Sequence, residues 1–204
     1  MSPFRTLPVL AASAVLTVLA GCSAAPDTAF PTTPTTAATT AAASPGTPSP
    51  GVTAVEQPAA PTKVAIPSVG ITSSLMKLGL NADGTVEVPP ADQGMTAGWY
   101  TGGSVPGAAG AAVIIGHNDT RYGKAVFHDL REIAKGADIT VTNTRGETVH
   151  FTVTGTESVS KKTFPTEKVY GATKAHALRL ITCDGAFDAQ GHPVNNLIVY
   201  ATLD

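Results

Sequence analysis

Short β-type stretches, separated by turns that are rich in glycine and proline, most strongly constrain how residues 63–204 can fold. The chain holds 20 glycines and 16 prolines in 204 residues, and only 14% of its residues are charged. A helix-rich protein carries more charged residues and fewer helix breakers. Strands are expected at 63–67, 71–80, 85–88, 111–115, 138–142, 147–154, 177–182 and 197–201, and a short helix at 126–133. This pattern predicts a mainly β domain built as a closed or nearly closed barrel.

A charged start, a short apolar stretch and a cysteine are typical of a secretion signal. Arg5 provides the positive charge, and the apolar residues 7–20 are too few to span a bilayer as a helix. Residues 19–22 (Leu-Ala-Gly-Cys) resemble a bacterial lipobox, whose cysteine is acylated and becomes the mature N-terminus. We expect residues 1–21 to be a lipoprotein signal peptide and Cys22 to be the lipidation site. An ordinary signal with a chance cysteine, or an uncleaved anchor, stays open.

Residues 22–62 have the composition of a tether. Alanine, threonine, proline and serine dominate this stretch, and Asp27 and Glu56 are its only charged residues. Repeated proline prevents helix and sheet, and too few large apolar side chains are present to form a core. We expect a disordered Ala/Thr/Pro-rich tether. With a lipid on Cys22, it would hold the following domain on the extracytoplasmic face of the bacterial cell membrane.

Charge and cysteine content exclude some classes of function. The net charge is -2 and the pI is about 6.2, so the chain lacks the basic excess of a nucleic-acid-binding protein. No set of cysteines and histidines has zinc-finger spacing. We therefore expect no nucleic-acid partner, no metal site and no cofactor.

Two residue types with nucleophile and base chemistry follow expected strands. His117 comes after the apolar run 111–115 and Gly116, and Cys183 comes directly after 177–182. A strand end presents a side chain on a rigid scaffold, and imidazole is the usual partner of a reactive thiol. On residue types alone, a buried structural cysteine and a turn histidine are the simpler interpretation.

The local sequences around both residues resemble those of sortases. Residues 180–183 (Leu-Ile-Thr-Cys) resemble the sortase signature Thr-Leu-x-Thr-Cys, with Arg179 in place of the leading threonine, and 116–117 (Gly-His) resemble the histidine segment. Further matching segments occur in the order found in actinobacterial class F sortases, at 64–71, 88–90, 97–100, 125–130, 164–165 and 199–201. The resemblance covers essentially all of residues 63–204, which are therefore expected to form a sortase-like catalytic domain.

The resemblance implies a closed sortase-type β-barrel of about eight strands with short helices, and a cell-surface cysteine transpeptidase. Cys183 would attack the Thr–Gly carbonyl of a Leu-Pro-x-Thr-Gly-like sorting signal and form an acyl-thioester. His117 would act as proton donor and acceptor. The implied partners are secreted proteins with a C-terminal sorting signal, a peptidoglycan-related amine acceptor, and the membrane through the lipid on Cys22.

One family feature has no direct counterpart in this chain. Sortases use an arginine near the start of the last strand, where this sequence has Val194, Asn195 and Asn196. Either Asn196 or Asn195 substitutes through a neutral amide, or Arg121 or Arg179 reaches the site, or the enzyme is slow or inactive.

Two other functions remain open from the sequence. The first is a degenerate, non-catalytic sortase-like lipoprotein that binds wall peptides, which the missing arginine favours. The second is a different cysteine enzyme such as an L,D-transpeptidase, whose characteristic signature the chain lacks.

Overall fold

The computed structural model describes residues 58–204. The expected signal peptide (1–21), the lipidation site Cys22 and the tether up to residue 57 lie outside the described residues.

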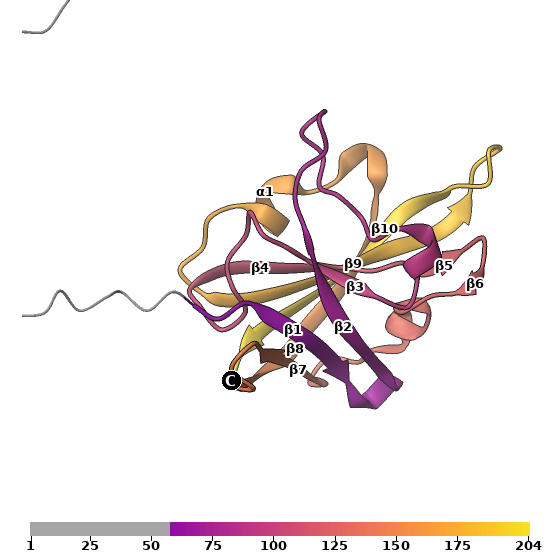
Figure 1. Ribbon diagram of the computed structural model, residues 1–204. Helices are drawn as coiled ribbons and strands as arrows, with labels where there is room; N and C mark the ends of the chain where they lie inside the picture. Colours follow the sequence, from indigo (N-terminus) through magenta and orange to yellow (C-terminus); the bar gives the residue numbers. More distant parts are fainter. Residues whose placement is uncertain (1–57) are drawn as a thin grey trace, which may run out of the picture. The chain divides into compact units, whose positions relative to one another are not determined.

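Eight strands close into a barrel in the order β1-β2-β3-β4-β9-β10-β8-β7 (Figure 1). These strands are β1 (Pro61–Ile66), β2 (Ile71–Leu78), β3 (Ala97–Tyr100), β4 (Gly110–Ile115), β7 (Asp138–Asn143), β8 (Thr148–Ser160), β9 (His176–Phe187) and β10 (Pro193–Leu203). The β2–β3 and β4–β9 pairs are parallel, and the remaining barrel pairs are antiparallel. The expected mainly β, closed eight-stranded barrel is confirmed.

The remaining elements are short. They are the two-stranded β5 (Asp119–Thr120) and β6 (Gly123–Lys124), the 3-10 helices η1 (Pro67–Val69), η2 (Ala91–Gln93), η3 (His128–Glu132) and η4 (Lys161–Thr163), and the helix α1 (Thr166–Tyr170). Within residues 58–204, none of the helices has the length and apolar character needed to traverse a bilayer.

The wall formed by β4, β9 and β10 is buried on both faces. Leu178 and Leu180 of β9 face the barrel interior, where they join the main core cluster. Ile181 of β9 and Ile198 of β10 face outward and pack with Val169 of α1 in a second cluster. Because side chains alternate along a strand, Cys183 lies on the same outer face as Ile181.

Several expected boundaries were wrong. β9 continues to Phe187, so Cys183 lies within the strand, because pairing with β10 continues past the apolar run. Residues 85–88 form no barrel strand, and Val86 makes only an isolated bridge to Leu80. The expected helix at 126–133 is reduced to η3, and its i to i+3 bonds, such as Leu130 N to Phe127 O, are those of a 3-10 helix.

The turn that leads from β4 to His117 has no room for a side chain at Gly116. A Cβ atom at Gly116 would lie 2.5 Å from Cδ2 of Phe127 and 2.8 Å from Cγ1 of Val126. Both neighbours are buried in the core. We predict that Gly116→Ala lowers the free energy of unfolding by about 1–3 kcal/mol, as measured by chemical denaturation.

The matched control is Gly155→Ala in β8, where no atom lies within 4 Å of the added Cβ. This variant is expected to stay within about 0.5 kcal/mol of the parent. Equal stability of the two variants would contradict the steric argument.

Candidate active site

One cavity on the outer face of the β4–β9–β10 wall brings the predicted site residues together. Its volume is about 680 Å³, and Cys183, His117 and Asn196 all line it. They come from β9, from the turn after β4 and from β10. His117 and Asn196, which are 66 and 13 positions away from Cys183 in the sequence, thus meet Cys183 at a single site.

Cys183 is a half-buried free thiol whose backbone is fixed from two sides. It pairs with Asn196 in the antiparallel β9–β10 register. Its carbonyl accepts a 3.1 Å hydrogen bond from Nδ2 of Asn118, which follows His117. This bond ties the turn after β4 directly to the nucleophile candidate on β9.

His117 is held by the segment that connects β2 to β3. Its Nε2 lies 2.6 Å from the carbonyl oxygen of the buried Pro89. A carbonyl only accepts, so Nε2 carries a proton and donates it in this bond. Among residues 58–204, no hydrogen bond joins the His117 ring to the Cys183 thiol. The two groups line the same cavity without a hydrogen bond between them.

Lys161 is a site residue that sequence reasoning missed. Its Nζ lies 3.6 Å from Sγ of Cys183, and its side chain lines the same cavity. In the sequence, Lys161 and Lys162 look like an ordinary solvated pair. Only the register of β8, β10 and β9 brings residue 161 next to residue 183, and no local pattern encodes that register.

The two candidate arginines do not reach the cavity. The Arg179 guanidinium lies 4.8 Å from the ring centroid of Tyr200, and its Nη1 donates to the Leu178 carbonyl at 3.0 Å. Burial lowers the pKa of Arg179. Arg121 donates to the hydroxyl of its neighbour Tyr122 at 2.7 Å. Neither arginine lines the cavity that contains Cys183.

Of the two asparagines proposed as substitutes, only Asn196 lines the cavity. Asn195 points instead to β8, where its Nδ2 lies 3.4 Å from Oγ of Ser158.

Away from Cys183, the cavity is apolar. Leu80, Val86 and Val88 line it from the connection between β2 and β3. Tyr170 of α1 and Tyr100 of β3 line it as an edge-to-face pair with centroids 5.8 Å apart. The cavity therefore combines a few polar groups, among them Cys183, with a mostly apolar lining that can take an extended, partly apolar chain.

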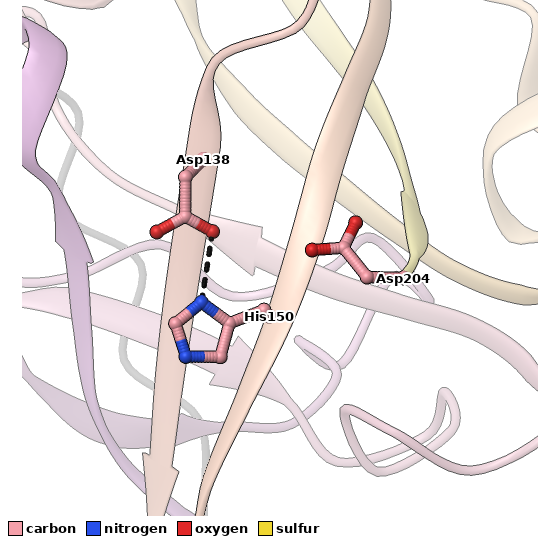
Figure 2. A group of neighbouring side chains, drawn as sticks. All are labelled: Asp138, His150 and Asp204. Carbon is pink, nitrogen blue, oxygen red and sulfur yellow. Dashed lines mark hydrogen bonds and ion pairs between the residues drawn. The ribbon is translucent and has the colours of Figure 1, made fainter.

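A second group of ionisable side chains lies outside this cavity. In Figure 2 a dashed line joins His150 to Asp138, and Asp204 lies near both without a drawn contact to either. One potential ligand atom from each lies within 4.8 Å of the others, and imidazole and carboxylate are ligands for divalent cations such as Zn²⁺. His150 already pairs with Asp138 at 3.0 Å, and Thr152 donates a hydrogen bond to Asp204. These groups therefore have protein partners, and none lines the cavity of Cys183.

Comparisons with known proteins agree on one family. The sortase domain family model matches residues 64–204. No curated protein matches the sequence.

Several solved structures that resemble this barrel are sortases. Sortase A from Corynebacterium diphtheriae is 20% identical with a TM-score of 0.56, over 73% of this chain and 62% of that chain. Sortase C-1 from Actinomyces oris is 21% identical with a TM-score of 0.55, over 70% of this chain and 73% of that chain. Sortase C1 from Streptococcus agalactiae is 18% identical with a TM-score of 0.56, over 74% of this chain and 70% of that chain. These likenesses show a shared fold.

The half-buried phenol of Tyr170 generates a prediction for alkaline pH. Burial, and then the neighbouring Tyr100, raise the pKa of Tyr170 from 10.0 to about 12. The unfolded chain therefore releases this proton first as the pH rises. The contribution of Tyr170 to stability should be complete below pH 10 and should be lost between pH 10 and pH 12.

In Tyr170→Phe, we expect the tyrosinate absorbance step near pH 12 to disappear. The alkaline fall in the free energy of unfolding should also become shallower. Tyr122→Phe, at a ring that is 64% exposed, controls for the loss of one phenol. Persistence of the step in Tyr170→Phe would contradict the assignment.

Proposed function

Because the chain belongs to the sortase family, we propose that it is a cysteine transpeptidase that cleaves a sorting signal and transfers the acyl part to an amine. The observation that carries the proposal is that Cys183 and His117 line one cavity with a mostly apolar lining. The cavity can hold an extended peptide while its scissile carbonyl lies over the thiol.

In this proposal, the Cys183 thiolate adds to the carbonyl carbon between threonine and glycine. The S–C bond forms, the tetrahedral oxyanion collapses, and the C–N bond breaks. His117 gives the leaving amine its proton. The acyl-thioester keeps the acyl group activated, so an incoming amine attacks it, His117 takes up the proton of that amine, and Cys183 leaves as thiolate.

The finer assignments rest on the sequence patterns. We propose a Leu-Pro-x-Thr-Gly-like signal on secreted proteins, a peptidoglycan-related amine as acceptor, and a place among the class F sortases. The lipobox-like residues 19–22 support lipid attachment at Cys22. Residues 22–62 would then tether the domain at the extracytoplasmic face of the membrane, with wall anchoring as the outcome of the reaction.

The test is detection of the covalent intermediate. The chain carrying Cys22→Ser, in which Cys183 is the only thiol, is incubated with a panel of Leu-Pro-x-Thr-Gly-like peptides, with and without an amine. We expect an acyl adduct on Cys183 by intact mass, which disappears when the amine is added. Cys183→Ala should form no adduct, and His117→Ala should slow adduct formation by about 10²–10⁴-fold.

His176→Ala is the matched histidine control, because this exposed residue contacts the Gly107 carbonyl and does not line the cavity. It should react like the parent. If the folded parent forms no adduct with any peptide, the transpeptidase proposal is wrong.

A further inference from the structure

The cavity contains a cation that the sequence did not reveal. Among the described residues that line it, Lys161 is the only lysine or arginine. Its Nζ lies 3.6 Å from Sγ of Cys183. No carboxylate within residues 58–204 forms an ion pair with it at 4.0 Å or less. Lys161 also makes the smallest of the contributions that lower the pKa of Asp188, after the backbone hydrogen bonds from His192 and Gln190 and the charge of His192.

The strand register explains why Lys161 reaches the thiol. Asn196 of β10 pairs with Cys183 on one side and with Val159 of β8 on the other. β8 ends at Ser160, and the Ser160 hydroxyl accepts the backbone N–H of Lys162 as the cap of η4. Strands β8 and β9 lie about 10 Å apart across β10. The long side chain of Lys161 extends over β10 to the sulfur.

The alternatives identified in the sequence do not supply this charge. Asn196 is neutral. Arg179 shares the outer face of β9 with Cys183, but four residues along a strand place it about 13 Å away. Its guanidinium is also bonded to the Leu178 and Ala201 carbonyls.

We propose that Lys161 is the active-site cation of this enzyme. Its ammonium group lies beside the Cys183 sulfur in the free protein and pairs with that sulfur when it is ionised. When sulfur adds to the substrate carbonyl, the negative charge moves from sulfur to oxygen, and the same ammonium donates a hydrogen bond to that oxyanion. When the C–N bond breaks, the oxygen's electron pair re-forms the C=O bond, the C–N bonding pair leaves on nitrogen, and His117 gives that nitrogen its proton. The hydrogen bond from Lys161 to the oxyanion rests on the proposed transpeptidase reaction. The pairing of Lys161 with the Cys183 sulfur does not depend on that reaction.

The ion pair is tested without any substrate. In the chain carrying Cys22→Ser, the alkylation rate of Cys183 is measured with anionic iodoacetate and with neutral iodoacetamide. A cation beside the sulfur favours the anionic reagent. We expect Lys161→Met to lower the iodoacetate-to-iodoacetamide rate ratio by about three- to tenfold. Lys161→Arg should keep the ratio near that of the parent.

Lys162→Met is the matched control, since Lys162 is the adjacent lysine in η4 and does not line the cavity. It removes the same net charge and should leave the ratio unchanged. Circular dichroism and thermal unfolding establish that each variant is folded. An equal ratio in folded Lys161→Met and in the parent would overturn the proposal.

Turnover of a peptide substrate tests whether Lys161 stabilises the oxyanion. With a peptide that the parent cleaves, Lys161→Met should lower kcat by about 10- to 1000-fold with KM little changed. Lys161→Arg should recover part of the rate. A change confined to KM would overturn the oxyanion role. Absence of any turnover in the parent, with the alkylation ratio still lowered by Lys161→Met, would refute the proposed reaction and leave the ion pair supported.

Discussion

The pairing of β10 with both β8 and β9 is the constraint on which the rest of the structure depends. The two registers meet at Asn196, which faces Val159 on one side and Cys183 on the other. A slip of one residue would turn Cys183 into the barrel interior. The inward residues Leu178 and Leu180 of β9 oppose such a slip, because it would expose them on the outer face.

The sequence predicted those parts of the site that local patterns encode. The closed barrel agrees with expectation, because short apolar runs with glycine and proline stops mark the strands. His117 and Cys183 were singled out because the sequences around them resemble those of sortases, and both residues line the same cavity. Lys161 could not be predicted, since its contact depends on register between strands that are separate in the sequence. The extent of β9 was underestimated because its outer part, Asp184 to Phe187, pairs with β10 without an apolar pattern.

The cavity contains two kinds of lining residue, ionisable groups and aromatic side chains. One thiol, one imidazole and one ammonium lie on three different elements, so no single loop motion moves them together. Elsewhere in the cavity, Tyr100 and Tyr170 pack edge to face and line it. Such a combination suits a reaction in which a peptide is held by its apolar side chains while charge changes occur at its carbonyl.

Closure of the barrel limits how a protein partner can be recognised. Each of the eight barrel strands among the described residues has a neighbour on both sides, but the β4–β9 pairing ends at Ile115 and Ile181, so Cys183 to Phe187 of β9 pair with β10 alone. Main-chain pairing of an extended peptide with the barrel is therefore limited to short strand ends, and such pairing contributes affinity more than selectivity. Selectivity must come from the fit of individual side chains to the cavity. Exchanging a few cavity residues should therefore redirect the chain toward a different peptide while the barrel stays intact.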